Sequence, residues 1–192
     1  MLLLVLGLVL FLGSHSVSIF APSVRAQLVG RIGVLPWQLL YGVVALVGLI
    51  LIVQGYAAAR QVADPVVLYS APTWMRHVAL LLLLPVFPLL LATYLPGRIA
   101  RAARHPMLLA VKFWALAHLL ANGTLADVLL FGGFLAWAVA DRISLKRRAG
   151  PPVPGAPAGR WNDLLALVLG LGIYVAFILG LHQWLMGVAP IG

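Results

Sequence analysis

Long apolar runs, separated by short polar or charged stretches, are the main pattern along this chain. A helix rises about 1.5 Å per residue and the hydrocarbon core of a bilayer is about 30 Å thick, so most of these runs are long enough to cross it. The runs cover residues 2–21, 36–56, 74–94, 106–121, 124–141 and 161–186. The pattern therefore predicts an all-α, polytopic transmembrane bundle of six helices.

The composition supports one membrane domain that takes up residues 1–192. The chain is 64% hydrophobic and 9% charged, whereas a soluble domain has about 25% charged residues. Residues 149–160 are rich in proline and glycine, which break helices, so we expect a linker there. The first run has no lysine or arginine before it and no small-residue cleavage site, so we expect it to be retained as a helix.

The basic residues indicate how the helices are oriented. With six helices, only Arg60 and Arg76 fall on one side of the membrane, and the other lysines and arginines fall on the opposite side. Those residues are Arg25, Arg31, Arg98, Arg101, Arg104, Lys112, Arg142, Lys146, Arg147, Arg148 and Arg160. Positive residues concentrate on the cytoplasmic side, so both termini are predicted on the outer, periplasmic side. This distribution also explains the net charge of +9 without nucleic-acid binding.

Several kinds of chemistry are excluded by what the sequence lacks. The absence of cysteine excludes disulfides, thiolate nucleophiles, iron–sulfur clusters and thiolate-ligated haem. The four acidic residues give no carboxylate pair within a span, and no serine–histidine–acid triad is visible. Gly132, Ala136 and Ala140 share one helical face, which we expect to pack closely against another helix.

The five histidines are the remaining candidates for chemistry. His77 and His182 are expected at the outer membrane interface, and His105 at the inner one. His15 and His118 lie deeper, about 9–13 Å and about 9–18 Å from the inner boundary. Side chains tilt toward the N-terminus of their helix, which brings these two imidazoles toward one level on antiparallel helices. A titratable group at this depth requires a partner.

Two interpretations of His15 and His118 remain open. In the first, the rings form a structural pair, with hydrogen bonds to each other or to a serine. In the second, they ligate one haem iron from opposite sides. Because the chain has no Cys-x-x-Cys-His motif, that haem would be b-type and non-covalent. Two histidines without a nearby carboxylate or cysteine give too few ligands for a typical zinc site.

Five further residues are candidates for contact with the haem. Phe11 and Trp114 each precede a candidate histidine by one helical turn and have either a stacking or a plain packing role. If the propionates point inward, Arg101, Arg104 and Lys112 either neutralise them or belong to the ordinary cytoplasmic charge.

Several motifs resemble hallmark segments of the NnrU family, and the similarity extends from residue 1 to about 186. The longest motif runs from Arg104-His105-Pro106 through Ala117-His118-Leu119-Leu120-Ala121-Asn122-Gly123. The others are Phe11-Leu12-Gly13-Ser14-His15-Ser16, Ala21-Pro22 with Arg25, Tyr94-Leu95-Pro96-Gly97-Arg98, and Phe134-Leu135-Ala136-Trp137-Ala138 leading to Asp141-Arg142.

The resemblance implies a multi-pass protein of the bacterial inner (plasma) membrane, associated with nitrite and nitric oxide reduction in denitrification. It also implies kinship with the plant 15-cis-zeta-carotene isomerase, which binds haem b through histidines and isomerises a cis double bond of a membrane-dissolved polyene. His15 and His118 stand where this family places its ligands. We therefore expect a haem b protein that acts in nitrogen-oxide reduction or in redox-gated isomerisation of a lipid-soluble substrate.

Two alternatives remain open beside this expectation. One is a cofactor-free membrane accessory or scaffold protein, and the other is a carotenoid cis-trans isomerase. Whether the protein is an enzyme is left open, with a haem-dependent isomerase as the candidate activity. The expected partners are membrane lipid and either a lipid-soluble polyene or a protein of nitrogen-oxide metabolism, with no nucleic acid.

Overall fold

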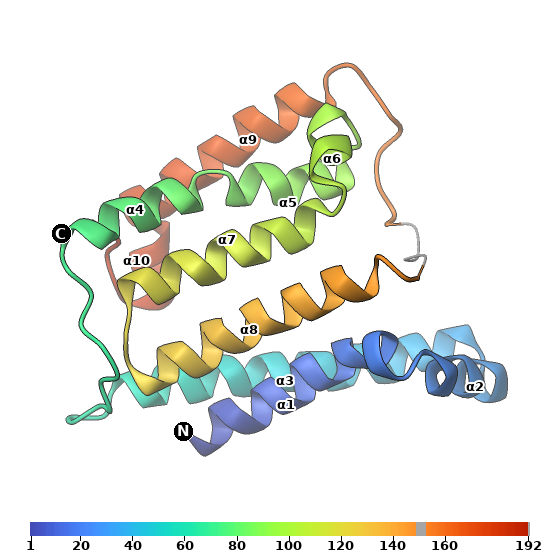
Figure 1. Ribbon diagram of the computed structural model, residues 1–192, viewed down its shortest axis with the longest axis horizontal. Helices are drawn as coiled ribbons and strands as arrows, with labels where there is room; N and C mark the ends of the chain where they lie inside the picture. Colours follow the sequence, from blue (N-terminus) through green and yellow to red (C-terminus); the bar gives the residue numbers. More distant parts are fainter. Residues whose placement is uncertain (149–152, 192) are drawn as a thin grey trace. The chain divides into compact units, whose positions relative to one another are not determined.

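A computed structural model describes residues 1–148 and 153–191, in which helices joined by loops are accompanied by an isolated bridge between Val67 and Thr124 and by no β-strand. The helices are α1 (Leu2–Phe20), α2 (Pro22–Ile32), α3 (Val34–Arg60), α4 (Trp74–Leu83), α5 (Val86–Tyr94), α6 (Arg98–Ala103), α7 (Pro106–Ala121), α8 (Leu125–Ser144), α9 (Asn162–Ala176), the π-helical turn η1 (Phe177–Leu181) and α10 (His182–Met186) (Figure 1). The all-helical prediction is confirmed for the described residues.

Four described segments are long and apolar enough to cross a membrane. They are Leu2–Phe20, Val34–Arg60, Trp74–Tyr94 and Asn162–Met186. The chain is therefore a multi-pass membrane protein. The count of six membrane-spanning helices stays a prediction. Helix α7, with 16 residues, is shorter than the four spanning segments, and α8 carries three charged side chains. The outer location of both termini also stays a prediction.

The helix boundaries agree with the predicted runs in some places and differ in others. The run 106–121 has the same bounds as α7. The run 74–94 is divided into α4 and α5 at Leu84 and Pro85, because proline has no N–H for the helical hydrogen bond. Helices α2 and α6 were not predicted. Of the expected linker, residues 149–152 lie outside the described residues, and residues 153–160 contain no helix.

The chain divides into two compact units, each built from two stretches that are distant in the sequence. Unit 1 consists of Met1–Ala71 and Ala121–Arg148, and unit 2 consists of Pro72–Leu120 and Ala149–Gly192. Unit 1 therefore contains α1, α2, α3 and α8, and unit 2 contains the other helices apart from the last residue of α7. His15 belongs to unit 1, whereas His118 and His182 belong to unit 2.

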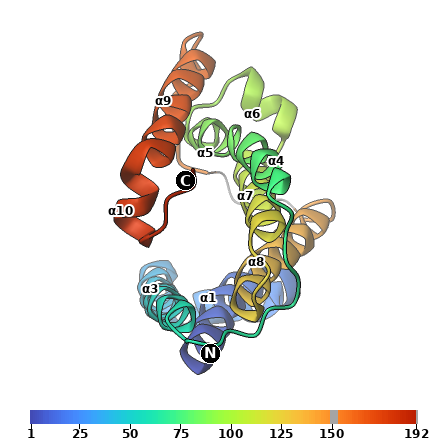
Figure 2. The same ribbon diagram turned by 90° about the vertical axis from the view of Figure 1, so that its left-hand side faces the viewer.

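In unit 1, α1 and α3 lie side by side and antiparallel along a seam of glycines (Figures 1 and 2). A Cβ atom on Gly7 of α1 would lie 2.5 Å from the backbone nitrogen of Ile52. A Cβ on Gly48 would lie 2.7 Å from the backbone nitrogen of Phe11, and one on Gly55 would overlap the backbone of Leu4. The absence of side chains at these glycines allows the two backbones to approach closely, which is how helices associate in membranes.

Helix α8 packs against α1 through a different face from the one predicted. A Cβ on Gly132 would meet only Val128 of its own helix, at 4.0 Å, and Ala136 is exposed. The approach to α1 is instead at Gly133, where a Cβ would lie 3.4 Å from Leu12 Cδ1. The close packing expected along Gly132, Ala136 and Ala140 was therefore wrong for unit 1. Residue spacing shows which face of a helix carries small side chains, but not which helix packs against that face.

A buried carboxylate fixes the start of α8. Asp127 is 5% exposed, and its oxygens accept hydrogen bonds from the Thr124 backbone nitrogen at 2.9 Å and the Thr124 hydroxyl at 2.6 Å. The Tyr56 hydroxyl of α3 donates to the same carboxylate at 2.6 Å. The Asp127 backbone nitrogen in turn donates to the Thr124 hydroxyl at 3.3 Å, which completes a capping box with the Thr124 backbone bond. Together these bonds satisfy the buried carboxylate. They also tie α8 to α3 within unit 1.

The loop after α3 is attached to the segment that precedes α8. The Leu68 backbone nitrogen donates to the Gly123 carbonyl at 2.8 Å, and the Tyr69 hydroxyl donates to the Asn122 carbonyl at 2.8 Å. Burial and the charge of Asp127 raise the pKa of Tyr69, so its hydroxyl keeps the proton that it donates. Gly123 has no space for a Cβ against the Tyr69 carbonyl.

In unit 2, α5 packs against both α7 and α9. Val86 and Leu89 of α5 form a buried cluster with Ala110 of α7. On the other side of α5, a Cβ on Gly170 of α9 would overlap the backbone of Pro88. The glycine in α9 thus permits a second close helix pair.

The short helix α6 is capped by a side chain from far along the chain. The carboxylate of Asp163 accepts from the backbone nitrogens of Arg98 at 2.8 Å and Ile99 at 2.9 Å. A Cβ on Gly97 would overlap that carboxylate. Asp163 therefore holds the start of α6 against α9 and satisfies two N–H groups that the helix leaves open.

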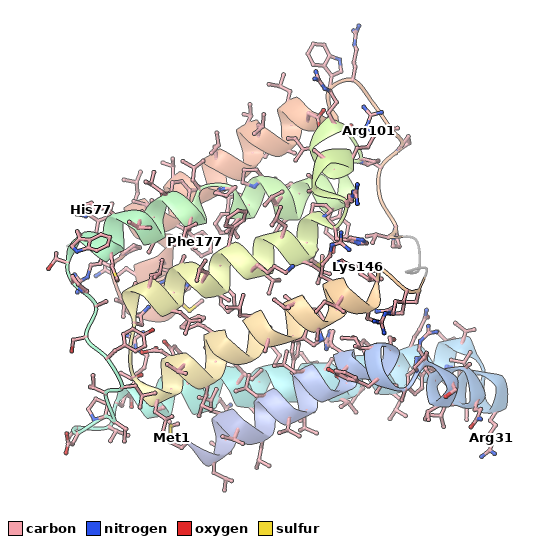
Figure 3. The ribbon with its side chains drawn as sticks, viewed as in Figure 1. Met1, Arg31, His77, Arg101, Lys146 and Phe177 are labelled. Carbon is pink, nitrogen blue, oxygen red and sulfur yellow. The ribbon has the colours of Figure 1, made fainter. Side chains whose placement is uncertain are left out.

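The labelled basic side chains lie toward the ends of the units. In unit 1, Arg31 and Lys146 lie at the end opposite Met1 (Figure 3). In unit 2, Arg101 and His77 lie at opposite ends (Figure 3). This separation within each unit agrees with the charge pattern from which the orientation was predicted.

Candidate functional site

His15 lies in an aromatic environment formed by three helices of unit 1. Its ring centroid is 4.3 Å from that of Phe11 on α1, 5.2 Å from Tyr41 on α3 and 5.9 Å from Trp137 on α8. The rings of Tyr41 and Trp137 meet the imidazole at steep angles of 61° and 88°. The contact with Phe11 follows from the helical spacing, whereas the other two depend on how α3 and α8 pack.

A backbone hydrogen bond determines which nitrogen of His15 carries the proton. Nδ1 lies 2.7 Å from the carbonyl oxygen of Phe11, and a carbonyl only accepts. Nδ1 therefore donates, and the neutral ring keeps the lone pair on Nε2. The Ser14 hydroxyl donates to the same carbonyl at 2.8 Å. This is the tautomer of a histidine that binds iron or zinc through Nε2.

Two further features next to His15 suit a polar ligand. The indole nitrogen of Trp137 is buried and has no hydrogen-bond partner among the described residues. Such a donor is costly unless a bound molecule accepts from it. A cavity of about 230 Å³ also opens beside Tyr41. Its lining residues are Ser14, Ser18, Arg25, Trp37, Gln38 and Tyr41.

His118 has the same local geometry in unit 2. Its Nδ1 lies 2.8 Å from the Trp114 carbonyl oxygen, so Nδ1 donates and Nε2 carries the lone pair of the neutral ring. The indole ring of Trp114 lies 5.3 Å from the imidazole, centroid to centroid. The aromatic residue one turn before the histidine is thus in ring contact with it, as in the His15 segment.

Besides Trp114, the ring of His182 lies near His118 within unit 2. The two ring centroids are 6.5 Å apart and the planes differ by 24°. His182 Nδ1 donates to the Val188 carbonyl at 2.7 Å, and the Phe177 ring lies 6.5 Å from the imidazole. His182 was expected at the outer interface. A π-helical turn precedes His182 and rotates the residues after it relative to a regular α-helix. The helical spacing of the run 161–186 does not predict such a turn.

Two of the predicted cationic contacts lie between α6 and α7 and within α7. Arg104 is exposed at the end of α6 and has a positive φ of 60°, a conformation that costs a non-glycine residue about 1–3 kcal/mol. Lys112 is half-buried in α7, between Arg104 and His118 along the chain. Their roles toward a haem stay predictions. Arg25, which the sequence analysis named for its charge and within a family motif but not as a ligand contact, is the cationic residue that lines the cavity next to Tyr41.

The donor chemistry fits the cofactor that the resemblance implies. Within the described ranges there is no group of three or more histidine or aspartate side chains that would hold a metal ion by itself. A haem needs only one or two protein ligands, and His15 and His118 each present the required tautomer beside an aromatic ring. The meeting of these two rings across a shared gap stays a prediction.

Comparison with known proteins gives one positive result. Neither the curated proteins nor the solved structures contain a significant match to this chain. A protein-family model described as "NnrU protein" matches residues 3–190, which is nearly the whole chain. The protein therefore belongs to the NnrU family.

Proposed function

We propose that this protein binds haem b in the bacterial inner membrane, with His15 and His118 as axial ligands. In this proposal it acts in nitrite or nitric oxide reduction, or in redox-gated isomerisation of a lipid-soluble substrate. The observation that carries the proposal is the shared geometry of the two histidines. In each, Nδ1 is bound to the carbonyl four residues earlier and the ring packs on the aromatic side chain of that residue.

The residues around each histidine have distinct roles in this proposal. The carbonyls of Phe11 and Trp114 hold the imidazoles in one orientation and in the ligating tautomer. The two aromatic rings keep water away from the metal-binding nitrogens. Arg104 and Lys112 neutralise the propionates. When bound, haem would supply a redox-active iron centre held by the imidazoles of His15 and His118.

The test is an absorption spectrum of the detergent-purified protein, recorded with and without dithionite after expression with ample haem. We expect a Soret band that shifts on reduction, weakens in the His15→Ala and His118→Ala variants, and is lost in the double variant. The matched control is His77→Ala, because His77 is exposed at the start of α4 and makes no part of either histidine environment. A full band in the double variant would refute the proposal.

The two alternative functions give different results in the same strains. A cofactor-free accessory protein keeps its cellular phenotype in both histidine variants and loses it when Gly132, whose face α1 leaves open, becomes leucine. A carotenoid isomerase converts a cis-polyene in a carotenoid-producing host, and only under reducing conditions. If the histidine variants lose the nitrogen-oxide phenotype and no polyene is converted, the result supports a role of the haem protein in nitrite or nitric oxide reduction.

A further inference from the structure

We propose that unit 1 binds an anionic phospholipid at its basic end, independently of any haem. The site is a cavity of about 500 Å³ where the end of α1, the start of α2 and the end of α8 come together. Its lining combines apolar side chains with two arginines. The lining residues are Ile19, Phe20, Pro22, Ala140, Ile143, Ser144, Arg147 and Arg148.

The apolar part of this cavity faces outward rather than into the protein. Phe20 is 76% exposed and Ile143 is 51% exposed. Side chains of this kind at the end of a membrane helix pack against lipid chains, because nothing else in unit 1 covers them. An acyl chain that lies along Phe20 and Ile143 places its headgroup at the level where α8 ends.

The two arginines differ in how much charge they offer a headgroup. Arg148 forms an ion pair with Asp141, and its Nε donates to the Ser144 hydroxyl at 2.8 Å. Its charge is therefore largely used within the helix end, and its guanidinium is held in place. Arg147, which directly precedes Arg148, is exposed. A guanidinium binds a phosphodiester with two parallel hydrogen bonds, so Arg147 is the residue that we assign to the phosphate.

The charge of the surrounding segments explains why the lipid should be anionic. Helix α2, the end of α8 and the turn after it contain six basic side chains against one acid, Asp141. The basic residues are Arg25, Arg31, Arg142, Lys146, Arg147 and Arg148. A zwitterionic headgroup gains little from this excess, whereas a headgroup with net negative charge is attracted by it. The occupant is thus a phospholipid such as phosphatidylglycerol rather than phosphatidylcholine.

The test compares the binding of phosphatidylglycerol and phosphatidylcholine with identical acyl chains to the delipidated full-length protein, by native mass spectrometry. We expect the wild type to prefer phosphatidylglycerol. Each basic residue near an anionic lipid contributes about fivefold in affinity, so Arg147→Gln should reduce the preference about fivefold. Arg147→Lys should give an intermediate loss, because it keeps the charge but not the paired hydrogen bonds.

Two further variants distinguish lipid binding at this cavity from general attraction by the positive charge of the protein. Arg31→Gln removes an exposed basic residue of α2 that does not line the cavity, so the preference should stay at the wild-type value. Phe20→Ala should lower the affinity for both lipids by the same factor and leave the preference for phosphatidylglycerol unchanged. Circular dichroism checks that each variant keeps its helix content, as expected for exposed side chains.

Three results would overturn the proposal. Equal losses in Arg147→Gln and Arg31→Gln would show that net charge alone attracts the lipid. Displacement of phosphatidylglycerol by inorganic phosphate at equal concentration would show a site for a free anion and not for a lipid. An unchanged preference in Arg147→Gln would remove the assigned phosphate ligand.

Discussion

Replacing Gly7 by alanine is the most direct way to test the seam between α1 and α3. The new methyl group would lie 2.5 Å from the Ile52 backbone nitrogen and 2.8 Å from the Gly48 carbonyl oxygen. Backbone atoms cannot rotate away, and ordinary contacts at this point require 3.4–4 Å. The two helices must therefore separate by about 1 Å, the difference between those distances.

The cost follows from what the seam buries. Leu4 is fully buried there and Ile52 is 5% exposed. A buried leucine gains about 4–12 kcal/mol of dispersion energy, and a gap of 0.5–1 Å forfeits a quarter or more of it. The expected loss is about 1–3 kcal/mol, which matches the usual penalty for overpacking. Because lipid offers no hydrophobic drive to bring helices together, little else compensates for this loss.

The assay is reversible unfolding in mixed micelles of mild detergent and sodium dodecyl sulfate, followed by circular dichroism. Gly13→Ala is the matched control, because Gly13 lies in the same helix and a Cβ there meets nothing within 4 Å. Alanine is about 1 kcal/mol better than glycine as a helix former, so this variant should be neutral or slightly more stable. Equal unfolding free energies for Gly7→Ala and Gly13→Ala would refute the reasoning.

Three other substitutions test separate contacts. Tyr56→Phe removes the donor to buried Asp127 and should lower the unfolding free energy by about 1–3 kcal/mol in the same assay, whereas no loss would mean that water replaces the hydroxyl. Trp137→Phe removes a buried donor that has no partner among the described residues, so stability should stay level or rise by about 1 kcal/mol, while the spectrum of the haem-loaded protein shifts. His182→Ala should keep the Soret band but change its position, because an imidazole 6.5 Å from the His118 ring is lost. A spectrum identical to the wild type would show that His182 does not act on the site.

Much of the helical pattern could be predicted because it depends on local composition. The run 106–121 and α7 agree because Pro106 favours a helix start and the Asn-Gly pair after Ala121 favours an end. Helix α6 was missed because its start is stabilised by Asp163, which is distant in the sequence. No local pattern contains that information.

In the candidate site, contacts within one helix could be predicted from the sequence, whereas contacts between helices could not. Phe11 and Trp114 could be identified because they precede their histidines by one turn of the same helix. The contacts of His15 with Tyr41 and Trp137 could not, because they depend on the packing of three helices. The proximity of His182 to His118 could not be predicted either, because the two residues lie on different helices and a π-helical turn precedes His182.

The interleaving of the two units has a consequence for biosynthesis. Chains leave the ribosome from the N-terminus, so α1, α2 and α3 enter the membrane first, and α8 follows only after residues 72–120 have been made. During that interval Tyr56 has no Asp127 to bind, and one aromatic wall of the His15 environment has not yet been translated. The glycine seam involves residues up to Gly55 alone. It is therefore the contact that can hold the nascent hairpin together until its last helix arrives.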